Sequence, residues 1–188
     1  MSDVNRLRFP TPETYTDEQR RVAQIALSSA RGRIVGPLPA WLTSPVVGEH
    51  LHLVGAYLGF RSTLPRDVVE LAIITTAKQR GSAYAWKVHL PRAHEHGVPE
   101  AVTIAIGEGH LPDFKDARQA LAYEATVRLN QTSALPDALY DRATAIFGDQ
   151  GVVELVALVG FYHIVAMTLN VFGSWDEPHK QDQSTEDL

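Results

Sequence analysis

Residues 70–96, ELAIITTAKQRGSAYAWKVHLPRAHEH, include a carboxylate and an imidazole, those of Glu70 and His89, within sequence that otherwise favours buried helices. The segment 68–77 is apolar on nearly every side, which is typical of a helix enclosed by other helices. Gly81 offers an end to this helix and Ser82 a beginning to the next. We therefore expect two antiparallel helices joined by a tight turn.

The predicted turn brings Glu70 and His89 towards each other. Glu70 lies eleven residues before Gly81, and His89 lies eight residues after it. With a rise of about 1.5 Å per residue, the two side chains differ in height by about one helical turn, so we expect a direct or water-bridged contact. Pro91 cannot donate a hydrogen bond within a helix, which predicts a kink or break just past His89.

Helical patterns cover most of the rest of the chain, so we predict an all-α fold with one domain. Thr16 and Thr63 are expected as N-caps, and a loop is expected at 148–151 before a long apolar helix. One expected helix begins at Thr16, and another begins at Ser82, as described above. The others cover 46–60, 63–80, 98–106, 113–130, 133–147 and 152–172. Residues 1–15 are interpreted as an extended arm, 16–175 as the helical domain, and 176–188 as a disordered polar tail.

The composition excludes several classes of protein. The 188 residues are 45% hydrophobic, enough for one substantial core. Lys and Arg total 17 against 22 Asp and Glu, a net charge of −5 without a basic stripe, which argues against nucleic acid as a partner. The absence of cysteine rules out disulfides and thiolate metal sites, and the N-terminus has no apolar signal-peptide run, so we expect a cytoplasmic protein.

The segment 152–172 approaches the length of a membrane span, but it contains Glu154, His163 and Asn170. We expect this helix to be buried in protein rather than in lipid. Burying it in so small a chain requires a partner subunit, which predicts a homo-oligomer. Its opening, VVEL at 152–155, repeats the VVEL at 68–71, either by duplication of a helical hairpin or by chance.

The spacing of Glu70, Ser82, Ala85 and His89 resembles the motif of the alkylhydroperoxidase D and carboxymuconolactone decarboxylase superfamily. That motif has Glu, then Cys twelve residues later, a second Cys three residues on, and His four residues on. The resemblance covers roughly residues 40–175, and it implies an all-helical fold that assembles as trimers or hexamers. Both redox cysteines are missing here, replaced by Ser82 and Ala85.

This replacement decides which activity the resemblance implies. Peroxide reduction by a cysteine pair needs an attacking thiolate and a resolving thiol, so it is not carried over. The acid and base of the decarboxylase branch, matched here by Glu70 and His89, work without metal, flavin or thiol. We therefore expect no cofactor.

Glu70 and His89 are the predicted catalytic residues. Burial is expected to raise the pKa of Glu70 towards the range useful for proton transfer, whereas an ion pair with Arg66 is the structural alternative. His89 suits a general acid or base, although a hydrogen-bonded core histidine is the common alternative. Predicted substrate contacts are Ser82 (or a simple N-cap), Tyr84, Trp86 and His163.

The remaining histidines have no assigned role. His50 and His52 cannot share one helix face, so one of them would face the pocket and the other solvent, unless both are surface residues. His94 and His96 fit a helix C-terminus better than a metal site with His89, and we predict no metal.

These residues support a cofactor-independent lyase that decarboxylates a small organic acid, such as a lactone or a β-keto-type acid. The same groups would serve an isomerase or hydratase. A third hypothesis is a non-catalytic helical oligomer that binds a small molecule or a protein. Arg61, Arg66, Lys87 and Arg92 are equally eligible to bind a substrate carboxylate.

Overall fold

The computed structural model describes residues 6–30 and 32–173, and the regular elements of this part of the chain are helices, as the sequence predicted. In chain order they are α1 (Asp17–Leu27), α2 (Leu38–Trp41), α3 (Pro45–Phe60), α4 (Arg66–Gln79), α5 (Ala83–Glu95), α6 (Glu100–Glu108), α7 (Ala117–Thr132) and α8 (Asp137–Phe172). Thr16 forms the predicted N-cap of α1, in a capping box with Gln19.

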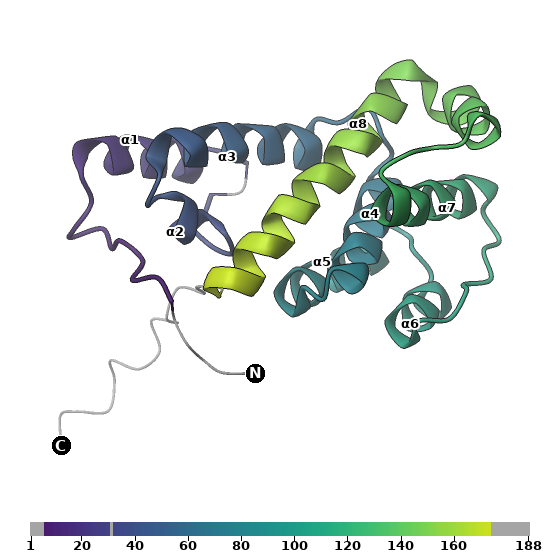
Figure 1. Ribbon diagram of the computed structural model, residues 1–188, viewed down its shortest axis with the longest axis horizontal. Helices are drawn as coiled ribbons and strands as arrows, with labels where there is room; N and C mark the ends of the chain where they lie inside the picture. The colour runs from purple at the N-terminus through teal and green to yellow at the C-terminus, as the bar shows by residue number, and fades with distance from the viewer. Residues whose placement is uncertain (1–5, 31, 174–188) are drawn as a thin grey trace.

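The long helix α8 runs through the middle of the molecule (Figure 1), with α1 to α3 on one side of it and α4 to α7 on the other. Helix α4 contacts α5, α7 and α8, and every residue from Asp67 to Ala77 is buried. The apolar segment around Glu70 is therefore enclosed by other helices, as predicted. This enclosure places the Glu70 carboxylate in the interior rather than at the surface.

The turn between α4 and α5 closes as a Schellman motif. Gly81 has a φ of 63°, a left-handed conformation that glycine adopts without strain. The amide of Ser82 donates to the carbonyl of Ala77 at 2.9 Å, and the amide of Gly81 donates to that of Lys78 at 3.2 Å. Helices α4 and α5 pack together as the predicted antiparallel pair.

The break predicted after His89 is absent, because α5 continues through Pro91 to Glu95. Pro91 and Lys87 both lie on the exposed face of α5. The Lys87 carbonyl, which loses its helical donor at Pro91, can therefore hydrogen-bond to water. Keeping the helix intact holds Arg92, one turn beyond His89, on the same face of α5.

The loop predicted at 148–151 is reduced to one residue. Gly148 has φ 69° and ψ 170°, and helical structure resumes at once on either side of it within α8. Such a conformation bends the helix axis sharply, and the bend is visible where α8 turns in Figure 1. The longer part of α8, after the kink, carries the residues that face α4 and α5.

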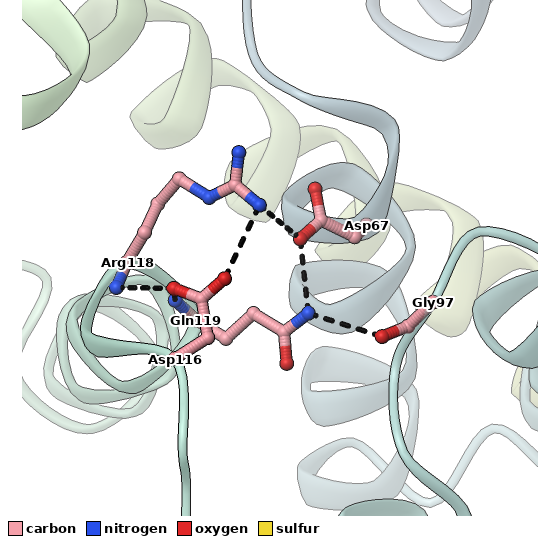
Figure 2. A network of polar contacts seen from close by, with 5 residues as sticks. All are labelled: Asp67, Gly97, Asp116, Arg118 and Gln119. Carbon is pink, nitrogen blue, oxygen red and sulfur yellow. Dashed lines mark hydrogen bonds and ion pairs between the residues drawn. The ribbon is translucent and has the colours of Figure 1, made fainter.

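A polar network fixes α7 against the first turn of α4 (Figure 2). The carboxylate of Asp67 accepts from Nη2 of Arg118 at 2.7 Å and from Nε2 of Gln119 at 2.9 Å. Asp116 caps α7, and Gln119 also donates to the carbonyl of Gly97. These bonds link α4, α7 and the loop after α5, so they support the helix that carries Glu70.

The predicted arm is described from residue 6 onward. Thr11 and Thr14 close a turn within it, and Tyr15 packs against Val22 and Leu42. The predicted disordered tail, 176–188, lies outside the described residues.

Candidate active site

Glu70 lies on α4 with 1% of its surface exposed. One carboxylate oxygen accepts a hydrogen bond of 2.8 Å from Nη2 of Arg66, one turn earlier on the same helix. The other carboxylate oxygen lies 2.7 Å from Nδ1 of His89 on α5. The predicted contact between Glu70 and His89 is therefore direct, and the ion pair with Arg66 exists beside it.

The carboxylate of Glu70 is held in its ionised form. Burial raises its pKa, but the hydrogen bond from His89 and the positive charges of His89, Arg66 and Arg92 outweigh that effect, and the pKa lies below its ordinary value. The prediction that the pKa of Glu70 would be raised was wrong, because the effects of these partners together exceed that of burial. Glu70 is thus an acceptor that orients His89 rather than a store of protons.

The second ring nitrogen of His89 faces Tyr162 on α8. The Tyr162 hydroxyl lies 3.1 Å from Nε2, and the two rings meet edge to face with their centres 5.3 Å apart. When the imidazole is neutral, Nδ1–H donates to Glu70 and Nε2 accepts from the Tyr162 hydroxyl. Glu70, His89 and Tyr162 form a continuous hydrogen-bonded chain across three helices.

This chain of hydrogen bonds ends at a cavity of about 180 Å³, which His89 and Tyr162 both line. A protein cavity of about 150 Å³ can admit benzene, so this cavity has room for one ring or a branched chain of similar size. Its walls come from the loop before α2 and from α2, α3, α5 and α8. The apolar part of the lining comprises Val35, Pro37, Leu38, Trp41, Leu51, Ala85, Val88, Phe161, Val165 and Leu169.

Of the predicted substrate contacts, only Tyr84 lines this cavity. Ala85, at the position of the second cysteine in the motif, lines it as well. Ser82 occupies the N-cap position of α5, but its side chain makes no capping bond and is buried away from the cavity. Trp86 packs beside Gly107, between the two larger apolar clusters.

His163 belongs to a different polar cluster. Its Nε2 lies 2.5 Å from Oδ1 of Asn130 on α7 and 3.1 Å from Nε of Arg80 at the end of α4. Burial and the positive charge of Arg80 lower the pKa of His163, which favours the neutral ring. The structure therefore brings Tyr162, one residue earlier, to His89, and leaves His163 outside the cavity lining.

The two histidines of α3 face opposite ways, which confirms the pocket-and-solvent interpretation of this pair. His52 is 5% exposed and lines the cavity, whereas His50 is exposed. His94 lies in the last turn of α5, where its Nε2 is 2.8 Å from Oγ1 of Thr103, and His96 is the C-cap.

Arg92 also lines the cavity, with Arg33 from the loop before α2. Sequence reasoning left Arg92 among four eligible cations and did not consider Arg33. The sequence spacing could have singled out Arg92, because it follows His89 by three residues and therefore lies on the same helix face. Nothing in the sequence singles out Arg33.

A second buried carboxylate, that of Glu154 on α8, holds the turn between α3 and α4. It accepts hydrogen bonds from Tyr57, Ser62, Gln150 and both the amide and the hydroxyl of Thr63. Burial raises its pKa, but these donors together lower it to about 2. Thr63 therefore donates hydrogen bonds to Glu154. It is not the predicted N-cap of α4, because Pro65 occupies that position.

No protein-family profile and no curated protein sequence matches the chain. Solved structures do match it. An uncharacterized peroxidase-related protein from Ralstonia eutropha JMP134, described as an alkylhydroperoxidase AhpD core, superposes with a TM-score of 0.74 at 14% identity and with 92% of each chain covered. An uncharacterized peroxidase-related protein from Silicibacter sp. TM1040 superposes with a TM-score of 0.73 at 14% identity, over 93% of this chain and 92% of the other. The chain has the alkylhydroperoxidase D-like fold.

Proposed function

We propose that the protein is a cofactor-independent enzyme that moves a proton to or from carbon on a small organic acid, with decarboxylation as its reaction. One observation carries the proposal. The hydrogen-bonded chain from Glu70 through His89 to Tyr162 ends at a cavity large enough for a small substrate. A buried acid–base chain that reaches a cavity is the arrangement that general acid–base catalysis requires.

The proton-carrying form of this chain is the His89 imidazolium. The ionised Glu70 stabilises that cation through Nδ1–H, while Nε2–H donates to the oxygen of Tyr162. Tyr162 also lines the cavity. Tyr162 delivers a proton to substrate, regains one from His89, and His89 is reprotonated from solvent.

In a decarboxylation, the bond between the carboxylate carbon and its neighbour breaks and carbon dioxide leaves. The electron pair passes into an adjacent carbonyl and gives an enolate, whose oxygen needs a hydrogen-bond donor. Tyr84 and His52 line the cavity and carry such donors. The carbon then takes its proton from Tyr162, so one carboxylate and one proton yield one product and one carbon dioxide.

An isomerase or a hydratase would use the same proton transfer, and the chemistry of the site supports either as an alternative. A thiol peroxidase mechanism has no nucleophile in this chain, because the sequence contains no cysteine and Ala85 lines the cavity at the position of the second motif cysteine. The word peroxidase in the names of the two similar structures is therefore not extended to this protein.

Exchange of carbon-bound hydrogen for deuterium tests the proposal for all three reaction types. Small 2-oxo and 3-oxo acids and unsaturated lactone carboxylates are incubated with the protein in D₂O and followed by NMR. We expect at least one of them to gain deuterium or lose carbon dioxide with the parent protein and not with His89→Gln. Equal rates with both proteins across the whole panel would contradict the proposal and favour a non-catalytic binding protein.

We also propose that the protein assembles with copies of itself. An open apolar groove lies between α3 and α8, lined in part by Leu53, Val54, Val153 and Ala157. Val153 is 67% exposed, and Leu53 and Val54 are also exposed. A contiguous apolar surface of this kind favours a protein–protein contact. One wall of the groove is α8, whose most apolar segment has a mean hydropathy of 2.0 and is 56% buried.

A further inference from the structure

Arg92 and Arg33, the two arginines that line the cavity, lack the carboxylate partner that several other arginines have. Five arginines form ion pairs with carboxylates, namely Arg20, Arg21, Arg66, Arg118 and Arg142. The guanidinium groups of Arg92 and Arg33 make no hydrogen bond or ion pair with any residue in 6–30 and 32–173. Arg92 is half-buried, whereas Arg33 is exposed at the cavity.

Within the part of the chain that the structure describes, the cavity lining does not compensate these charges. None of the described residues that line it is Asp or Glu. Glu70, the carboxylate whose pKa Arg92 helps to lower, is already hydrogen-bonded to Arg66 and His89. A half-buried guanidinium that pairs with none of the described residues has lost part of its hydration, so an anion that enters beside it gains more than it would at the open surface.

From this placement we propose that Arg92 is the anchor for a carboxylate on the substrate, with Arg33 assisting at the rim. The planar guanidinium offers paired N–H donors that match the two oxygens of a carboxylate. The rest of the substrate would lie against Leu38, Trp41 and Phe161, which are apolar. The ligand class is therefore a carboxylate with an apolar body of about one ring, as the cavity of about 180 Å³ allows.

The anchor also restricts which carboxylate reacts. A carboxylate bound to a guanidinium is stabilised as an anion, and this interaction is lost when the group leaves as neutral carbon dioxide. The carboxylate at Arg92 is therefore retained in the product. In a decarboxylation, a second carboxylate, the one that leaves, would instead lie along the apolar wall. Poor solvation of its charge there favours its loss as carbon dioxide.

The spacing of Arg92 and His89 fits this assignment. They lie three residues apart on α5, about one helical turn, and both face the cavity. A carboxylate held at Arg92 thus places the carbons next to it near the ring of His89 and the hydroxyl of Tyr162. The inference rests on the proposed function in taking this cavity as the substrate site, but it can be measured without turnover.

Calorimetric titration with benzoate, benzamide and benzylamine tests the anchor, because these probes share one ring and differ in charge. We expect benzoate to bind the parent protein at least about tenfold more tightly than benzamide, the effect of one hydrogen bond to a charged group. Arg92→Gln should remove this preference. Arg92→Lys keeps the charge and should retain part of it, and Arg33→Gln should weaken it less than Arg92→Gln does.

Lys87→Gln is the matched control, because Lys87 lies on the same helix but is exposed and does not line the cavity. It should leave the preference for benzoate unchanged. Equal binding of benzoate and benzamide, a preference that survives in Arg92→Gln, or no saturable benzoate binding would each overturn the anchor. Benzoate selectivity without any deuterium exchange would support the anchor and contradict the proposed catalysis. Deuterium exchange without benzoate selectivity would support the catalysis and contradict the anchor.

Discussion

Tyr162 and Glu70 hold opposite nitrogens of the same imidazole, with the Tyr162 hydroxyl 3.1 Å from Nε2 of His89 and the Glu70 carboxylate 2.7 Å from Nδ1. The Glu70 side of the ring is closed by Arg66 and the body of α4. Tyr162 lines the cavity, and neither Glu70 nor Arg66 does. In the proposed mechanism, protons therefore pass between His89 and a bound substrate on the Tyr162 side.

Removing the hydroxyl of Tyr162 should separate catalysis from stability. We expect Tyr162→Phe to lower kcat by about 10²-fold to 10⁴-fold, the usual contribution of a positioned proton donor. The lost hydrogen bond should lower the free energy of unfolding by only about 1 kcal/mol. Steady-state kinetics and urea unfolding measure the two effects.

The control for this variant is Tyr123→Phe on α7, a half-buried tyrosine that does not line the cavity. Its kcat should stay at the parent value. If Tyr162→Phe turned over as fast as Tyr123→Phe, the proton would have to reach the substrate directly from His89 or from water.

Replacing Glu70 with Gln should weaken the fold in a way that depends on pH. The folded-state pKa of Glu70 is depressed below 4.5, so the unfolded chain binds a proton more readily. The stability that the ionised carboxylate supplies is thus complete above the unfolded pKa and is lost as the pH falls through the folded value. We expect Glu70→Gln to lose about 1–3 kcal/mol at neutral pH and to approach the parent in acid.

Urea unfolding of both proteins from pH 7 down to pH 3 gives this difference directly. The same variant should also lose turnover, because His89 is no longer held with Nδ1–H towards a charged acceptor. A constant difference in stability across the pH range would mean that folding does not lower the pKa of Glu70.

The helices and the contact between Glu70 and His89 could be predicted because local signals determine them. Gly81 and Gly97 end helices with left-handed glycines, Thr16 caps α1, and the apolar run around Glu70 has no exposed side. These signals depend on neighbours within a few residues in the sequence. The distance from Glu70 to Gly81, and from Gly81 to His89, then determined the contact.

The rest of the site depends on how the helices are rotated against one another. The sequence pattern of α8 shows two adjacent aromatic or polar side chains, Tyr162 and His163, without showing which of them faces α5. The direction of the pKa shift at Glu70 depends on the combined effects of His89, Arg66 and Arg92, and burial alone predicted the wrong direction. That no carboxylate is among the described residues lining the cavity beside Arg92 is likewise a property of the assembled helices.

Glu154 should make the protein sensitive to acid. Its pKa is lowered to about 2 from 4.5, so its contribution to stability is complete above about pH 4.5 and disappears as the pH falls towards 2. In Glu154→Gln an amide faces groups that all donate hydrogen bonds, which should cost about 1–3 kcal/mol at neutral pH. The difference from the parent should shrink on acidification.

Glu124→Gln is the comparison, since Glu124 pairs with Arg142 on the exposed surface. Exposed ion pairs contribute about 0–1 kcal/mol, so this variant should unfold almost as the parent does. Equal losses in Glu154→Gln and Glu124→Gln would argue against the role of Glu154 in holding the turn between α3 and α4.

Two glycines of α3 should respond to alanine in opposite directions. A Cβ at Gly55 would lie 2.5 Å from Cζ of Phe161, a residue of the cavity wall, whereas a Cβ at Gly59 meets nothing within 4 Å. Gly55→Ala should therefore cost about 1–3 kcal/mol through overpacking and weaken benzoate binding. Gly59→Ala should add about 0.5–1 kcal/mol, because alanine restricts the unfolded chain. Thermal unfolding and calorimetry would show whether the two variants diverge; stabilisation by Gly55→Ala would mean that Phe161 has room to move.

The groove between α3 and α8 should determine the state of association. Val153 is 67% exposed within it, and placing a charge there would require an ion to be buried at any interface between two copies. We expect the parent protein to sediment as an oligomer and Val153→Asp, alone or with Val54→Asp, to shift it to smaller species. Leu111→Asp is the matched control, because Leu111 is 85% exposed and lies outside this groove. Sedimentation velocity over a range of concentrations decides the matter: a monomeric parent refutes self-association, and an oligomer that Val153→Asp leaves intact places the interface elsewhere.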